Sequence, residues 1–132
     1  MQTFIGIVIA LIIFGVLVLI HEFGHFIVAV KNKVTVNEFS IGMGPRIYSH
    51  VAKSGTRYSL KLLPLGGSCA MLGEDEDNNE EGSFNSKSIW ARMAIVFAGP
   101  FFNFILAFVL ALIVIGAKGI DKSYVTYVDE KS

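Results

Sequence analysis

This sequence contains few cysteines and prolines, and it has no net charge. Its 132 residues include one cysteine and three prolines, and 11 basic residues balance 11 acidic ones. The lone Cys69 cannot form an internal disulfide, and we expect it to be a small buried apolar residue. A chain with a net charge of zero has no electrostatic support for binding nucleic acid. Nucleic acid is therefore not an expected partner.

Charged residues are also too few for an ordinary soluble domain. The sequence is 53% hydrophobic and only 17% charged. Residues 4–20 contain no charge, and residues 94–117 contain one strongly polar side chain, Asn103. Each run approaches or exceeds the roughly 20 residues that cross about 30 Å of hydrocarbon. The first run lacks the basic start and the cleavage site of a signal peptide. We therefore predict a polytopic α-helical membrane protein in a lipid bilayer.

Basic residues are absent from the start of the chain and concentrate in its middle. Residues 1–30 contain no Lys or Arg, residues 31–93 contain eight, and residues 94–132 contain three. Positive charge marks the cytoplasmic side of membrane proteins. We therefore expect both ends of the chain outside the cytoplasm and the central region inside. The expected divisions are a first transmembrane helix at 1–33, a membrane-associated β region with an acidic loop at 34–88, a second transmembrane helix at 89–118 and the start of an extracytoplasmic domain at 119–132.

A His-Glu-x-x-His motif lies within the first apolar run. On a helix His21 and His25 share one face, and Glu22 lies about 100° around the axis. Two imidazoles and a neighbouring carboxylate that can act as a general base are typical of zinc hydrolases. Ionisable groups in hydrocarbon also indicate a functional site by default. The alternative is that the histidines only link helices through hydrogen bonds, which leaves Glu22 unexplained.

The central region carries the alternating pattern of a β-hairpin. Residues 57–62 alternate strictly and place Tyr58 and Leu60 on one face. A turn at 54–55 and a partner strand at 46–51 complete the hairpin. A further strand is expected within 34–41, before a flexible segment at 42–45, and the extended region is expected to end at 63–67. The small sheet can lie at the membrane interface and bind a substrate strand by β-augmentation, with Tyr58 and Leu60 as substrate-binding or structural residues. The alternative is an ordinary surface hairpin.

Three other polar features have simpler interpretations. His50 lies in the hairpin and is expected to be solvated rather than a third metal ligand. Six carboxylates within residues 74–81 lack the spacing of a calcium loop and predict a solvated, mobile loop. Asn103 lies on a stripe of small residues with Gly99, Ala107 and Ala111, which we expect to face the first helix. Its amide can hydrogen-bond near the metal or simply join the two helices.

The motifs, taken together, resemble those of the site-2 protease family of intramembrane zinc metalloproteases, in the bacterial branch that cleaves anti-sigma factors and signal-peptide remnants. The matching residues are 21–25 (HEFGH), 39–45 (FSIGMGP), 63–67 (LPLGG), 71–74 (MLGE), 84–85 (FN) with Trp90 and Arg92, and 98–100 (AGP) with Asn103. The resemblance implies that His21 and His25 bind Zn²⁺ and that Glu22 is the catalytic base. It also implies a bacterial plasma-membrane location, transmembrane protein substrates and a PDZ-like domain beginning in 119–132.

The chain departs from this family at two places. Family members bring a third zinc ligand, an aspartate before a glycine in a later transmembrane helix, and neither hydrophobic run here contains Asp. Residues 68–70 (SCA) stand where the branch has a bulkier aromatic and a basic residue. A catalytic zinc has three protein ligands and a water. We therefore expect a remaining part of the polypeptide to supply the Asp, and this chain alone to hold zinc weakly and turn over little substrate.

The leading hypothesis is thus a zinc endoprotease that hydrolyses peptide bonds within or near transmembrane segments. One alternative is a membrane subunit that moves ions or protons through Glu22 and the histidines. Another is a truncated, non-catalytic relative. Residues 124–128 look like a first strand with nothing after it to pair with, which predicts that the sequence stops short of a domain.

Overall fold

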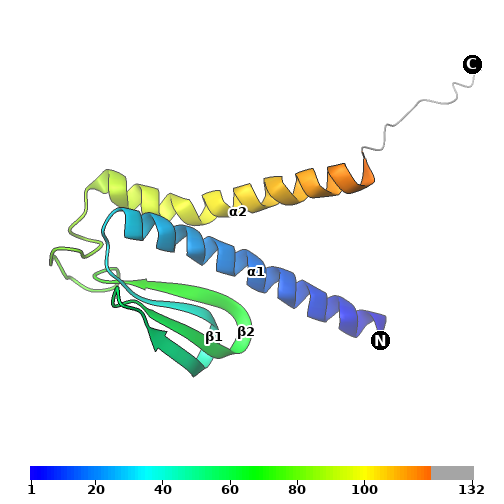
Figure 1. The fold of residues 1–132 in the computed structure, drawn as a ribbon, viewed down its shortest axis with the longest axis horizontal. Coiled ribbons are helices and arrows are strands. Elements are labelled where there is room, and N and C mark those ends of the chain that lie inside the picture. The colour runs from blue at the N-terminus through cyan, green and yellow to red at the C-terminus, as the bar shows by residue number, and fades with distance from the viewer. Residues whose placement is uncertain (120–132) are drawn as a thin grey trace, which may run out of the picture.

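The computed structural model describes residues 1–119, with four elements in chain order (Figure 1). These are α1 (Gln2–Lys31), β1 (Val36–Val51), β2 (Arg57–Met71) and α2 (Ile89–Lys118). The α1 helix lies between α2 and the sheet, and the two helices are close at one end and diverge toward the other (Figure 1). The predicted fold class, two long apolar helices with an inserted β-hairpin, is confirmed. The strand predicted at 124–128 lies outside the described residues.

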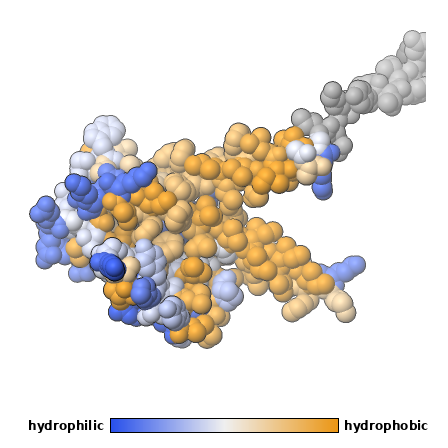
Figure 2. Space-filling view, viewed as in Figure 1, coloured by the Kyte–Doolittle hydropathy of each residue, from blue (hydrophilic) through white to orange (hydrophobic). Residues whose placement is uncertain are grey.

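Both helices have the length and surface of membrane spans. Each contains 30 residues, which corresponds to about 45 Å at 1.5 Å per residue. Only Gly24 and Ala29 of α1, and Ile95, Ala98 and Gly99 of α2, are buried. The diverging halves of both helices expose an almost continuous hydrophobic surface (Figure 2). Such a surface requires lipid rather than water, so the chain is a membrane protein.

The helices cross where small residues face each other. A side chain on Gly24 would overlap the carbonyl of Ala98, so glycine is required for this approach. The predicted packing stripe is therefore correct at Gly99 and Asn103, which lie against α1. Ala107 faces His21 across a cavity and Ala111 is exposed, so neither is packed against α1.

The sheet differs from the prediction because each strand is longer than expected. β1 contains 16 residues and β2 contains 15, and they form a two-stranded antiparallel sheet. The segments 42–45 and 63–67, predicted as a flexible link and as the end of the extended region, belong to these strands. Gly42, Gly44 and Gly66 have φ values of 87°, 88° and 73°, so they bend the strands without ending them.

These bends allow the two strands to pair with each other in three places. Residues 46–51 pair with 57–61, residues 38–41 face 57–60, and residues 36–41 also pair with 67–71. The segment containing Tyr58 and Leu60 therefore has a partner on both sides. The segment 67–71 has β1 on one side and no strand on the other within residues 1–119.

The bent end of the sheet extends along α1. The Pro64 carbonyl lies 3.2 Å from the position of a Cβ on Gly15, and Val18 Cγ1 lies 3.4 Å from that of Gly66. Gly15 precedes Lys31, at the end of α1, by about 24 Å of helix. Met43, Leu62 and Leu63 at the bend are exposed. Their apolar character suits contact with lipid, and the interfacial position of the sheet stays a prediction.

A charged cluster joins three segments of the sheet. The carboxylate of Glu38 pairs with Arg46, lies 3.5 Å from Lys61 Nζ and accepts a hydrogen bond from Ser59 Oγ at 3.1 Å. Burial alone would raise the pKa of Glu38. The hydrogen bonds and positive charges outweigh burial, so the pKa lies below its usual value.

We expect Glu38→Gln to lower the stability of the sheet by about 1–2 kcal/mol, because it removes a charged hydrogen-bond acceptor from two cations. Since the folded pKa is lowered, the contribution of Glu38 is present above its unfolded pKa and disappears as the pH falls through the folded value. Thermal unfolding in detergent at several pH values measures both effects. Glu81→Gln, in an exposed position, is the matched control. Equal stability of the two variants would contradict the assignment.

The small core lies where the sheet, the end of α1 and the start of α2 meet. It contains Ala29, Val34, Val36, Phe39, Cys69, Met71 and Ile95. Cys69 is thus a small buried core residue, as predicted. The following loop is tied to the core by hydrogen bonds from Phe84 N to Leu72 O and from Thr35 N to Gly82 O, at 2.7 and 2.8 Å. Most of the acidic residues between these anchors are exposed to solvent, as expected.

Candidate metal centre

His21 and His25 lie on successive turns of α1, and both point at the same residue of α2. Their ring centroids are 4.8 Å apart. The position of a Cβ on Gly99 would lie 2.5 Å from His25 Nε2 and 2.7 Å from His21 Nε2. The two Nε2 atoms therefore converge in front of a backbone that carries no side chain. The absence of a side chain at Gly99 leaves room for a small ligand between the imidazoles.

The ring of His25 is fixed by the backbone of α2. Its Nδ1 lies 2.7 Å from the carbonyl oxygen of Ile95. A carbonyl only accepts hydrogen bonds, so Nδ1 carries the proton and Nε2 keeps a free lone pair. Histidines that bind metals characteristically donate their second nitrogen to such an acceptor. No residue type in the sequence signals this contact, because the acceptor is a main-chain atom.

Asn103 lies against the second nitrogen of His21. Its Nδ2 is 3.4 Å from His21 Nδ1, and its Oδ1 is buried without a hydrogen-bond partner among the described residues. Turning the amide about its Cγ places Oδ1 on Nδ1–H, which satisfies the oxygen and leaves His21 Nε2 free. Both histidines then offer Nε2 to a metal. This arrangement matches one of the two roles expected for Asn103, a hydrogen bond beside the metal.

We expect Asn103→Leu to lower zinc affinity about 10- to 100-fold, the usual effect of removing a group that orients a metal ligand. Leucine has a similar volume but cannot accept a hydrogen bond from His21 Nδ1. Competition with a chromogenic zinc chelator measures the affinity in the full-length protein. Ala111→Leu, at an exposed position of the same helix, should leave it unchanged. An affinity unchanged in Asn103→Leu would contradict the proposed hydrogen bond.

Glu22 lies on a different side of α1, toward β2. Its Cγ is 3.8 Å from the position of a Cβ on Gly67, and the side chain is partly buried. Gly67 begins the strand segment 67–71, whose second edge has no strand partner in the described range. The carboxylate therefore stands between the histidines and a strand that can still accept a partner. A base in this place can serve a peptide bound along that strand.

The donor set fits zinc but is incomplete within residues 1–119. No cluster of three or more His, Cys, Asp or Glu side chains able to hold a metal occurs in this range. Cys69 lies in the small core, where burial and the charges of Glu22 and Glu74 raise its pKa to about 12. His50 lies in the sheet opposite Tyr58 and does not join the other two histidines. Two free imidazole nitrogens suit zinc, with further ligands to come from elsewhere.

Tyr58 and Leu60 lie in a groove close to the site. The groove, of about 340 Å³, separates the sheet from α1 and is lined mainly by aromatic and aliphatic side chains; they include Phe23, Phe26, Phe39, Ile41, Tyr48, Tyr58 and Leu60. On the side of α1 the groove is lined by Phe23 and Phe26, which lie one and four residues after Glu22. The ring of Tyr58 also packs at 6.1 Å from Phe26. The position suits either role expected for these two residues.

Space beside His21 opens between the diverging helices. One cavity of about 350 Å³ is lined by His21 and Asn103 with Pro100, Phe104 and Ala107. Another, of about 290 Å³, is lined by His21 and Asn103 with Phe14, Leu17 and Val18. Both cavities therefore reach His21 from the space between the two helices. A further protein segment could reach the metal position through either cavity.

Two converging imidazoles with a carboxylate at the next position of the same membrane span are typical of a membrane-embedded metallohydrolase. The sequence matches the model of Peptidase family M50 over residues 9–130, and the chain belongs to this family, the site-2 proteases.

Curated relatives agree with this family. A protein of Clostridium acetobutylicum, named as a zinc metalloprotease, is 49% identical over 119 residues, which are 90% of this chain and 35% of the relative. Similarly named proteins of Clostridium perfringens and Vibrio cholerae are 43% identical over 104 residues and 46% identical over 109 residues. These alignments cover 79% and 80% of this chain, and 31% and 24% of the two relatives. The chain thus spans about a third or less of the length of these relatives.

Proposed function

We propose that this chain forms part of an intramembrane zinc metalloprotease that hydrolyses peptide bonds within or near transmembrane segments of membrane proteins. One observation carries the proposal. The Nε2 atoms of His21 and His25 converge at Gly99 with their other nitrogens held by α2, and Glu22 follows His21 on the same helix. The structure supports this site without showing a reaction.

His21 and His25 would hold zinc through Nε2. When bound, zinc lowers the pKa of a water molecule and polarises a carbonyl group. Because a catalytic zinc has three protein ligands, we propose that an Asp from the remainder of the polypeptide completes the set. The cavities beside His21 and Asn103 are the positions where such a segment would enter.

Glu22 would move the protons of the reaction. Its carboxylate accepts a proton from the attacking water, and it then delivers a proton to the nitrogen of the leaving amine. No other acid is required, because one carboxylate performs both transfers in turn. The histidines, by contrast, would keep their Nδ1 protons throughout. His25 would donate its hydrogen bond to the Ile95 carbonyl, and His21 to the turned amide of Asn103.

The free edge of segment 67–71 would hold the substrate. A transmembrane helix protects its peptide bonds in hydrogen bonds, so the segment to be cut must first unwind. Its backbone then pairs with the edge of β2, next to Glu22, by β-augmentation. The groove with Tyr58 and Leu60 would receive an apolar side chain. Anti-sigma factors and signal-peptide remnants are the substrates that the family resemblance suggests.

The charge distribution supports a bacterial plasma-membrane protein with the sheet facing the cytoplasm. The eight basic residues within 31–93 would lie inside, and both ends of the chain outside. Reporter fusions on each side of α1 and α2 test this orientation. The opposite labelling would reverse the proposed topology without affecting the metal site.

Zinc content tests the proposed site directly. We expect the full-length protein, purified from membranes, to contain bound zinc, and His21→Ala to lose it because only one imidazole remains in this chain. Atomic emission on equal amounts of folded protein provides the measurement, and His50→Ala, in the sheet, is the control. A wild-type protein without zinc, unable to bind added zinc, would refute the protease proposal and favour a proton-relay role for these residues.

A further inference from the structure

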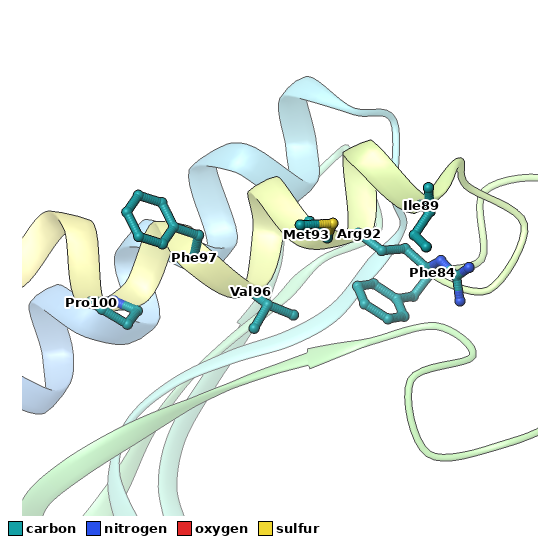
Figure 3. Close-up of a pocket in the computed structure, with 7 residues that line it drawn as sticks. All are labelled: Phe84, Ile89, Arg92, Met93, Val96, Phe97 and Pro100. Atoms are coloured by element: carbon teal, nitrogen blue, oxygen red, sulfur yellow. The ribbon is translucent and has the colours of Figure 1, made fainter.

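A second groove lies on α2, on the side of that helix opposite Ala98. It has a volume of about 530 Å³ and is lined by six side chains of α2 and by one from the preceding loop: Phe84, Ile89, Arg92, Met93, Val96, Phe97 and Pro100 (Figure 3). All but Arg92 are apolar. The groove is separate from the cavities beside His21, although Pro100 contributes to both.

The cation stands at the end of the groove nearest the membrane surface. Arg92 lies in the first turn of α2, beside Phe84 and Ile89, and Pro100 marks the opposite end (Figure 3). Trp90, two residues earlier in the same turn of α2, is 76% exposed. Tryptophan and arginine at the start of a span are typical of the headgroup level. The polar end of the groove is therefore placed where phosphate groups of lipids lie.

Arg92 lacks an anion within the described part of the chain. Its Nε is buried without a hydrogen-bond partner, the first turn of α2 contains no acidic residue, and both ion pairs in residues 1–119 use Glu38 instead. Leaving a buried donor of a charged group unpaired is costly. A phosphate fits this position, because a guanidinium can bind two of its oxygens at once.

The apolar part of the groove has the length of one leaflet. From Ile89 to Pro100 the helix rises about 16 Å, which is about half of a 30 Å hydrocarbon core. Met93, Val96 and Phe97 are bulky and exposed. Close helix contacts in lipid favour small residues instead, as at the Gly24–Ala98 crossing. An irregular surface of large side chains is better filled by a flexible acyl chain.

We propose that this groove binds an anionic phospholipid from the leaflet at the start of α2. The phosphate contacts Arg92, and one acyl chain follows Val96 and Phe97 toward Pro100. The bound lipid supplies the anion that Arg92 lacks among residues 1–119, and it covers the apolar face. This inference is independent of the proposed protease activity, since no residue of the metal site takes part.

Lipid retention by the full-length protein tests the proposal. The detergent-purified protein is incubated with equal amounts of phosphatidylglycerol and phosphatidylcholine, and bound lipids are counted by native mass spectrometry. We expect phosphatidylglycerol to be retained about tenfold more, since a charged hydrogen bond is involved and choline offsets the phosphate charge. Arg92→Gln should remove this preference, whereas Arg92→Lys should keep most of it.

Two further variants separate the groove from general charge effects. Lys87→Gln removes a nearby positive charge that does not line the groove, so it should leave the preference unchanged. Val96→Trp keeps Arg92 but fills the groove, so it should reduce retention of both lipids. The proposal is overturned if the wild type binds both lipids equally or binds none, as expected if another segment or a second copy covers the groove. It is also overturned if Lys87→Gln and Arg92→Gln lose the same amount.

Discussion

Glu22→Gln is expected to lower the rate of substrate cleavage by about 10²- to 10⁴-fold, the usual contribution of a general base, while zinc content stays unchanged. Glutamine has nearly the same shape as glutamate but cannot accept a proton from water. The side chain lies at Gly67 and not between the two Nε2 atoms. Its replacement should therefore leave the metal ligands in place. Cleavage of a single-span reporter by the full-length protein in liposomes measures the rate.

One control variant and two contrary outcomes test the role assigned to Glu22. Glu80→Gln, in the exposed acidic loop, should cleave at the wild-type rate. If Glu22→Gln keeps near-wild-type cleavage, another group takes the proton and the assigned mechanism is wrong. If Glu22→Gln loses zinc together with activity, Glu22 acts through the metal ligands instead. Measuring zinc and rate on the same preparation distinguishes these results.

The helices and the spacing of the motif could be predicted from the sequence because both depend on local rules. Long uncharged runs require lipid, and positions four apart on a helix share a face. His21 and His25 therefore had to point in one direction wherever the rest of the chain lay. Helix capping is a local rule of the same kind: the Oγ of Ser88, just before α2, accepts a hydrogen bond from Ala91 N at 3.3 Å.

The parts that were missed depend on contacts between distant segments. The acceptor for His25 is the backbone carbonyl of Ile95, and every residue type carries such a group. Gly99 could be assigned to a packing stripe, but the histidines it faces come from another helix. The sequence predicts a flexible link at 42–45 and the end of the extended region at 63–67, because glycine and proline usually interrupt strands. Only the pairing of residues 36–41 with 67–71 shows that the strands continue.

Gly99→Ala is expected to abolish zinc binding and cleavage, although it adds a single methyl group. The new Cβ would lie 2.5 Å from His25 Nε2 and 2.7 Å from His21 Nε2. Either the imidazoles move apart or the methyl group occupies the place between them, and in both cases the two nitrogens no longer share a metal. Alanine favours a helix over glycine by about 1 kcal/mol, so α2 itself should form normally.

Two alanine variants make this result interpretable. Gly116→Ala adds the same methyl group to α2 at a position with no neighbour within 4 Å, and it should keep zinc and activity. Gly24→Ala would press on the Ala98 carbonyl and separate the helices without entering the space between the histidines. It should lower the thermal stability of the full-length protein more than Gly99→Ala does. A Gly99→Ala protein that retains zinc and cleaves substrate would show that the two Nε2 atoms do not meet at this glycine in the active enzyme.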